Sequence, residues 1–182
     1  QAPLVPRQRV IEIEERVMAD GAVLRPLDSA QVLAAAERLR GEAPAALAVC
    51  FLHSYVNAEH EEMTAKRLRE HLPGWFVCHS AEVLPEMREY ERFNTAILNA
   101  YIGPITKRYL DALTRSLRGQ GYGGAVYLMT SSGGIVTAAR AARFPVHTVL
   151  SGPAGGVAAA IHLGQLLGTR NLITYDMGGT ST

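Results

Sequence analysis

The last residues of the chain combine residue types that together can hold a phosphate group. An apolar, β-branched run from Asn171 ends at Asp176, and a glycine pair and three hydroxyl residues follow. These are Gly178, Gly179, Thr180, Ser181 and Thr182. Glycine amides can approach an oxyanion closely, and the hydroxyls can donate hydrogen bonds to it. The Asp176 carboxylate suits a Mg²⁺ ion held through its water. A β-hairpin with a two-glycine turn is the alternative.

Two further glycine-rich turns lie upstream, and each also follows an extended segment. Their residues are Ser131, Ser132, Gly133 and Gly134 in the first turn, and Ser151, Gly152, Gly155 and Gly156 in the second. If the preceding strands are parallel, all three turns lie at the edge where open α/β sheets bind ligands. The second turn also precedes an expected helix at 157–167, whose first amides favour an anion. We rank the first turn below the other two as a binding site.

The first half of the chain alternates expected strands and helices. Residues 9–17 alternate apolar and charged side chains, and Asp20-Gly21 turns the chain into a return strand at 23–24. A helix starts after Asp28 and ends at Gly41, and Asn57 opens a second helix that runs to about Leu72. Apolar runs at 46–52 and 75–78 predict covered strands. This order predicts an α/β fold with a parallel or mixed sheet and crossover helices.

From residue 85 the pattern predicts a long amphipathic helix. Its expected inward stripe consists of Tyr90, Phe93, Ile97, Tyr101, Ile105, Leu110, Leu113 and Leu117. Pro104 lies inside it and predicts a kink or two abutting helices. A glycine-rich connector at 119–124 precedes an expected strand at 125–129, and residues 145–150 are expected to be extended. A final strand is expected from Asn171 to Asp176.

Composition excludes several classes of protein. The chain has 182 residues, no run of 18 apolar residues and a net charge of +1, with 18 cations against 17 anions. We therefore expect no membrane span and no nucleic-acid partner. Cys50 and Cys78 lie in apolar runs, so they are expected to be buried thiols of a reducing, cytoplasmic compartment.

Other candidate sites have plainer explanations. Cys50, His53 and His60 lack a second ligand pair at zinc spacing, so we expect hydrogen-bonded structural histidines. Adjacent strand residues point to opposite faces, which disfavours Cys78 and His79 as a nucleophile and its base. A charged cluster, consisting of Glu82, Glu86, Glu89 and Arg92, is expected to be a solvated helix start, with a lobe-interface or substrate-facing role as the alternative. His147 could face a cleft near Ser151.

Several motifs together resemble one family. The order of a strand, Ser151-Gly-Pro-Ala-Gly-Gly156, an alanine-rich helix, a strand and Asp176-Met-Gly-Gly-Thr-Ser-Thr182 looks like the hydantoinase A/5-oxoprolinase family, which includes the acetone carboxylase β subunit. The resemblance extends over nearly the whole chain. Its upstream motifs are Val5-Pro-Arg7 to Val17, Asp20-Gly21 and Pro26-Leu-Asp28, Ala48-Val-Cys-Phe-Leu-His-Ser-Tyr55 with Asn57 and His60-Glu61, Ser80-Ala-Glu-Val-Leu-Pro-Glu-Met-Arg-Glu-Tyr-Glu-Arg92, and Asn99-Ala-Tyr101.

The resemblance implies a ribonuclease H-like, actin-type ATPase fold, present here in part. Residues 1–84 would be the end of the family's N-terminal region, and 85–182 would be the start of its ATPase region. Asp176, Gly178, Gly179, Thr180 and Ser181 would contact ATP phosphates and Mg²⁺, with Ser151, Gly152, Gly155 and Gly156 nearby. The family's first phosphate hairpin has no match in residues 1–182, so we expect an internal part of a longer protein, inactive by itself.

The implied activity is the ATP-dependent hydrolysis of a cyclic amide, such as a hydantoin or 5-oxoproline, with a hydantoinase B-type partner subunit or domain. Phosphorylation of the amide oxygen would supply a leaving group. No residue is assigned to ring opening. An ATP-handling subunit of an acetone or ketone carboxylase is the alternative within the family. A non-catalytic assembly module at a lobe interface is the alternative of a different class.

Overall fold

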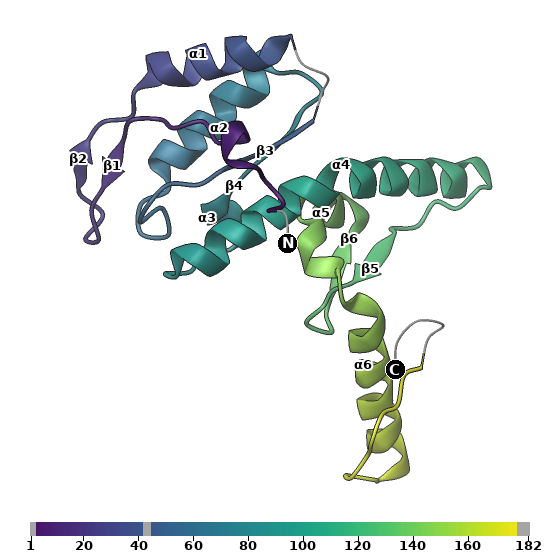
Figure 1. The fold of residues 1–182 in the computed structure, drawn as a ribbon. Coiled ribbons are helices and arrows are strands. Elements are labelled where there is room, and N and C mark those ends of the chain that lie inside the picture. The colour runs from purple at the N-terminus through teal and green to yellow at the C-terminus, as the bar shows by residue number, and fades with distance from the viewer. Residues whose placement is uncertain (1–2, 42–44, 178–182) are drawn as a thin grey trace. The chain divides into compact units, whose positions relative to one another are not determined.

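The structure is a computed structural model that describes residues 3–41 and 45–177 (Figure 1). The chain divides into two compact units, residues 1–104 (unit 1) and residues 105–182 (unit 2). The boundary falls at Pro104, inside the long helix α4 (Glu89–Gly119). The expected kink or break at this proline does not divide the helix into two assigned segments.

Unit 1 opens with the expected hairpin, in a shorter form. Strand β1 (Arg16–Val17) pairs antiparallel with β2 (Val23–Arg25), and Gly21 takes a φ of 87° in the turn. The strand expected over 9–17 forms only at Arg16–Val17: Arg9 ends a short 3-10 helix, η1 (Arg7–Arg9), and residues 10–15 have no strand assignment. Alternation alone does not make a strand, because the backbone of a strand also needs a pairing partner.

The helix α1 (Ser29–Arg40) starts at the residue that the sequence indicated. The carboxylate of Asp28 accepts hydrogen bonds from the amides of Ala30 and Gln31 at 2.9 and 3.1 Å. The Gln31 side chain does not return to Asp28 in a capping box. Its oxygen instead accepts from the amide of Glu14 at 2.8 Å, which ties α1 to the segment before the hairpin.

A parallel strand pair with a crossover helix forms the centre of unit 1. Strands β3 (Ala46–Val49) and β4 (Phe76–His79) pair in parallel, and α2 (Glu59–His71) connects them and packs against both. This confirms the α/β class. The buried core consists of Val32, Ala36, Val49, Ala65, Leu68, Leu72 and Val77. The sequence of α2 predicts that Met63 and Leu68 point inward; Leu68 lies in this core, whereas Met63 is exposed and that prediction is wrong.

The buried face of α4 in unit 1 is not the expected apolar stripe. Tyr90 and Tyr101 are 79% and 62% exposed, and the next stripe residue, Ile105, is 65% exposed. The buried residues on α4 within unit 1 are Arg92, Ala96, Asn99, Ala100 and Gly103. They are mostly small because α4 approaches β4 closely: a Cβ at Gly103 would lie 2.5 Å from the Phe76 ring. Close packing thus selects small side chains over large apolar ones.

A short helix, α3 (Ser80–Val83), joins β4 to the segment before α4. Unit 2 contains the end of α4, strands β5 (Tyr127–Met129) and β6 (Ile135–Thr137), helices α5 (Ala138–Arg143) and α6 (Ser151–Leu167), and the 3-10 helix η2 (Pro145–Thr148). β5 and β6 form an antiparallel hairpin, so the chain contains both parallel and antiparallel pairs, in agreement with the expected mixed arrangement. Residues 145–150, expected to be extended, begin with η2 instead.

Unit 2 leaves much of its apolar surface exposed. Six described residues of 105–177 are buried, namely Leu110, Thr130, Ala141, Phe144, Pro145 and Gly164. The strand expected over Asn171–Asp176 has no strand assignment, and Ile173 is 98% exposed. Within the described ranges, no helix has the length and apolar character needed to cross a membrane.

Substitution of Asp28 tests whether its side chain stabilises the start of α1. Asp28→Ala removes the acceptor of two amides and should lower the free energy of unfolding by about 1 kcal/mol in urea denaturation. Asp28→Asn keeps an acceptor oxygen and should lose much less. Equal losses for Ala and Asn would contradict the capping role.

Candidate functional site

The turn between β5 and β6, Thr130–Gly134, forms as expected. Hydrogen bonds among its own residues stabilise it. Gly133 takes a φ of 82°, a conformation that disfavours residues with a side chain. The hydroxyl of Thr130 accepts from the amide of Gly134 at 3.1 Å and lies 3.0 Å from the hydroxyl of Ser132. The turn is therefore ordered by its own side chains.

The structure brings this turn beside the start of α6. Ser131 hydrogen-bonds to His147 and Leu150, and Leu150 is the residue directly before the helix. Two of the three predicted glycine-rich segments therefore lie together in unit 2. His147 contributes its backbone carbonyl to this contact, while its ring lies against Phe144.

The second glycine-rich segment has a different local structure from the one predicted. Helix α6 starts at Ser151 rather than at Val157, so Ser151, Gly152, Gly155 and Gly156 form its first turns. Gly155 lies against the side chain of Met129 on β5, which explains a small residue there. The first amides of a helix have no partner inside it, so this end of α6 keeps the donor groups that an anion needs.

The third predicted segment is described only in part. Asp176 is exposed and has no polar partner among the residues that the structure describes. Gly178, Gly179, Thr180, Ser181 and Thr182 lie outside the described residues. A pocket of about 590 Å³ does lie in unit 2, between α6 and residues 168–174, but none of the predicted site residues in the described range lines it. Its lining is mixed, with apolar side chains such as Val157, Ile161 and Leu172 beside the polar residues Gln165, Thr169, Arg170 and Thr174.

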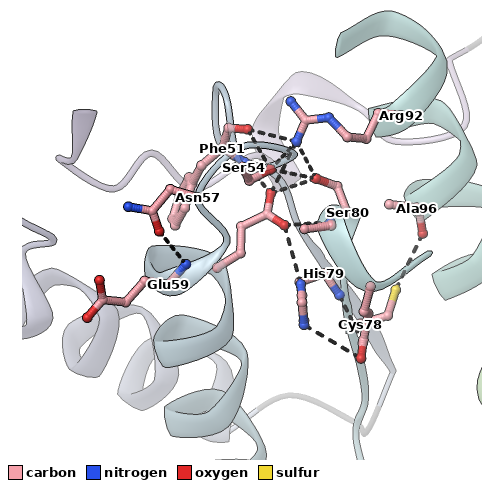
Figure 2. A network of polar contacts seen from close by, with 12 residues as sticks. Phe51, Ser54, Asn57, Glu59, Cys78, His79, Ser80, Arg92 and Ala96 are labelled. Carbon is pink, nitrogen blue, oxygen red and sulfur yellow. Dashed lines mark hydrogen bonds and ion pairs between the residues drawn. The ribbon is translucent and has the colours of Figure 1, made fainter. Parts of the chain in front are cut away.

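The strongest polar cluster of the described chain lies in unit 1, and the sequence analysis missed it (Figure 2). Its centre is the carboxylate of Glu61 on α2, which is fully buried. Oε1 accepts from the Phe51 amide at 2.7 Å and the Ser80 hydroxyl at 2.6 Å, and Oε2 accepts from the Ala81 amide at 2.8 Å. The carboxylate of Glu61 therefore binds both the loop after β3 and the first residues of α3, which follow β4.

Arg92 on α4 supplies the positive charge of this cluster and is also 0% exposed. Its Nη1 donates to the Phe51 carbonyl at 3.1 Å, to the Ser80 hydroxyl at 2.8 Å and to the Ser54 hydroxyl. Nη1 lies 3.8 Å from Oε1 of Glu61. The expectation that Arg92 belongs to a solvated helix start is therefore wrong. Arg92 is buried because it binds Phe51 and Ser54, about forty residues earlier in the chain. The sequence around Arg92 therefore gives no sign of its burial.

The environment of Glu61 favours its charged form. Burial alone would raise the pKa of this carboxyl. The imidazole of His79, 3.4 Å away, and the hydrogen bonds from Ser80, Ala81 and Phe51 outweigh burial and hold the pKa below its ordinary value of 4.5. The cluster is therefore a buried ion pair that is also hydrogen-bonded, the condition under which burial of charge is tolerated.

The histidines of the β3–α2 segment have structural partners, as predicted. Nδ1 of His53 lies 2.8 Å from the Val17 carbonyl, and Nδ1 of His60 lies 2.8 Å from the Glu15 carboxylate. Among the described residues, no group of three or more His, Cys, Asp or Glu side chains could hold a metal ion. His53 therefore attaches β1 to the loop after β3, and His60 attaches the residue before β1 to α2.

The cysteines are poor nucleophiles. Burial raises the pKa of the Cys78 thiol to about 11 and raises that of Cys50 further. The Cys78 thiol donates to the Ala96 carbonyl on α4 at 3.5 Å. At neutral pH both thiols stay protonated, which argues against thiolate chemistry at Cys78 and His79.

Comparison with known proteins places the chain in a family. The model of the hydantoinase/oxoprolinase N-terminal region matches residues 1–72, and the hydantoinase/oxoprolinase model matches residues 92–182. The chain belongs to the hydantoinase/oxoprolinase family. The division at residue 84 stays a prediction, because it falls between the two matches.

Several members of the family with known names are similar to the chain. It is 35% identical to caprolactamase subunit alpha of Pseudomonas jessenii over 178 residues, which is 98% of this chain and 26% of the relative. It is 31% identical to the acetone carboxylase beta subunit of Xanthobacter autotrophicus over 98% of this chain and 25% of that subunit. It is 31% identical to the 5-oxoprolinase of Saccharomyces cerevisiae over 88% of this chain and 12% of that enzyme.

Two solved structures contain the same fold. The crystal structure of the ATP-dependent caprolactamase from Pseudomonas jessenii matches with a TM-score of 0.85 and 34% identity, over 99% of this chain and 26% of that one. A nucleotide-free acetone carboxylase structure matches with a TM-score of 0.79 and 29% identity, over 92% of this chain and 24% of that one. The chain thus spans about a quarter of the length of these relatives.

Removing the buried guanidinium tests the cluster. Arg92→Met leaves the Glu61 carboxylate buried and uncompensated, so the free energy of unfolding should fall by about 3–5 kcal/mol. Arg88→Met is the matched control, since Arg88 pairs with Glu91 on the exposed surface. Urea denaturation followed by the fluorescence of Trp75, the single tryptophan, reports on unit 1. Similar losses for the two variants would contradict the proposed importance of burial.

The cluster should also make stability depend on pH. The native pKa of Glu61 lies below 4.5, so the unfolded state binds the proton first as pH falls. Its contribution is complete above the unfolded pKa and is lost as pH drops through the native pKa. Glu61→Gln should therefore flatten the fall in unfolding free energy below about pH 4.5. A wild-type and a variant profile of equal slope would refute this.

Proposed function

We propose that this chain is part of an ATP-dependent enzyme that hydrolyses cyclic amides. The observation that carries the proposal is its similarity to a caprolactamase subunit over 98% of its length, together with the fold match to an ATP-dependent caprolactamase. The relative that hydrolyses 5-oxoproline by name supports the same class of reaction. Since the chain spans about a quarter of the caprolactamase relative, the activity belongs to a longer protein.

The chemistry follows from the stability of the amide bond. An unstrained amide carbon is a poor electrophile, so hydrolysis needs activation. Transfer of the γ-phosphoryl group from ATP to the ring amide oxygen releases ADP and makes that oxygen part of a leaving group. Water then adds to the activated carbon, and the ring C–N bond breaks as the nitrogen takes a proton, which leaves an acyl phosphate. A second water hydrolyses this acyl phosphate to a carboxylate and inorganic phosphate. Enzymes promote phosphoryl transfer mainly by positioning and charge stabilisation.

The residues that we assign to the phosphate chain are those predicted from the sequence. The start of α6 would offer the amides of Ser151 and Gly152 as donors, with Gly155 and Gly156 in the same first turns, and the turn Ser131–Gly134 lies beside it. Asp176 and the segment Gly178–Thr182 would supply the second set of contacts. The contact between the first two segments supports a shared site. In this proposal the complete protein has the actin-type ATPase fold.

A Mg²⁺ ion fits the donor chemistry of Asp176. Its carboxylate is exposed and has no polar partner among the described residues, so it is free to bind the ion or its water. Mg²⁺ is commonly held by one or two carboxylates plus the substrate phosphates, which agrees with a single carboxylate here. When bound, the ion would neutralise charge on the phosphate chain.

Two other functions have support. The similarity to acetone carboxylase favours an ATP-handling subunit of a ketone carboxylase. The exposed apolar residues of α6, which include Ile161, Leu166 and Leu167, favour a module that docks onto further protein.

The caprolactamase and acetone carboxylase relatives are named as subunits, so we also propose a hydantoinase B-type partner.

Substrate-dependent ATP hydrolysis tests the proposal. The full-length protein with its partner subunit should hydrolyse ATP faster when 5-oxoproline, a hydantoin or caprolactam is present, and acetone should have no effect. Asp176→Asn should lower this rate by about a hundredfold, the scale of losing one charge-stabilising group. Asp111→Asn is the matched control, because Asp111 pairs with Lys107 on the surface.

The outcomes separate the three functions. Stimulation by acetone alone would favour the carboxylase. If the protein hydrolyses no nucleotide with any of these compounds, the docking module would be the one function of the three that remains.

A further inference from the structure

Ser131 makes three hydrogen bonds to the segment that leads into α6. Its amide donates to the His147 carbonyl at 2.7 Å, and its hydroxyl donates to the same carbonyl at 2.9 Å. The amide of Leu150 donates to the Ser131 hydroxyl oxygen at 3.2 Å. One side chain thus serves as donor and acceptor between two segments about twenty residues apart in sequence.

These bonds act where α6 lacks a cap of its own. Leu150 occupies the N-cap position and has no side-chain oxygen with which to hold the first turn. Pro153 has no amide, and the bond from the Ala154 amide to the Leu150 carbonyl is long, at 3.4 Å. The entry to this helix is therefore held from outside, by the turn between β5 and β6.

The neighbouring serine has a different role. The hydroxyl of Ser132 lies 3.0 Å from that of Thr130, inside the same turn, and contacts neither His147 nor Leu150 in the described structure. The turn therefore contains two adjacent serines, of which Ser131 faces the α6 entry and Ser132 faces the turn itself. A substitution at Ser132 is therefore a control for the same substitution at Ser131.

We propose that Ser131 is a positioning residue for the nucleotide site. It fixes the start of α6 against the turn Thr130–Gly134, so that both segments present their donors to one ligand in a single arrangement. Such preorganisation avoids the ordering cost that two independent segments would incur on binding. The inference rests on the proposed function, in which the ligand is the phosphate chain of ATP.

Amide hydrogen exchange tests the positioning directly in the 182-residue chain. Ser131→Ala removes two of the three bonds and keeps the one from the Ser131 amide. Exchange of the Leu150 amide, and of the Ala154 amide that donates to the Leu150 carbonyl, should become about two- to tenfold faster. Ser132→Ala should leave these amides unchanged, and Ser131→Thr, which keeps the hydroxyl, should restore slow exchange. Unchanged exchange in Ser131→Ala would overturn the inference.

Binding of Mg-ATP to the full-length protein gives the functional readout. Ser131→Ala should raise the dissociation constant several-fold, whereas Ser131→Thr, which keeps the hydroxyl, should bind like the wild type. Faster exchange with unchanged affinity would reduce Ser131 to an anchor of the helix and overturn its role at the site. Absence of Mg-ATP binding by the wild type would overturn the proposed function instead, and the exchange comparison would still decide the anchoring.

Discussion

The buried ion pair between Glu61 and Arg92 is the interaction on which unit 1 depends. Both side chains are fully buried, and burial of a charge is costly unless it is paired and hydrogen-bonded. Glu61 holds the loop after β3 and the turn after β4, and Arg92 brings α4 to the same groups. The pair also connects the two family matches, since Glu61 lies in the N-terminal region and Arg92 is the first residue of the second match. The two matched regions therefore meet within one compact unit.

This cluster occupies the edge of the parallel strand pair in unit 1. Ser54 and Ser80 follow the parallel strands β3 and β4, at the edge where α/β proteins often bind ligands. Here Arg92 and Glu61 occupy the hydrogen-bonding groups of both serines. We propose the binding site in unit 2 instead, where the turn Thr130–Gly134 contacts the entry to α6. Family membership supports this division of roles, because the glycine-rich segments lie in the hydantoinase/oxoprolinase match.

Local signals in the sequence predicted local structure well. The Asp28 cap, the turn at Gly21 and the β3–α2–β4 order each depend on neighbouring residues, and all are present. The failures concern features that distant contacts decide. The apolar stripe of α4 was wrong at Tyr90, Tyr101 and Ile105, which are exposed, and right at Leu110, which is buried. The close approach of α4 to β4 admits Gly103 but no large side chain. The burial of Arg92 needed acceptors on two other segments. The run from Asn171 to Asp176 is strand-like in composition, but pairing requires another strand, and none is paired with it in the described structure.

A double-mutant cycle on Glu61→Gln and Arg92→Met tests the central claim most directly. If the two side chains act as one buried unit, the loss of unfolding free energy in the double variant should be smaller than the sum of the single losses by about 2 kcal/mol. This result is expected because the second substitution removes the charge that the first leaves unpaired. Losses that add to within about 0.5 kcal/mol would show two independent residues and contradict the account.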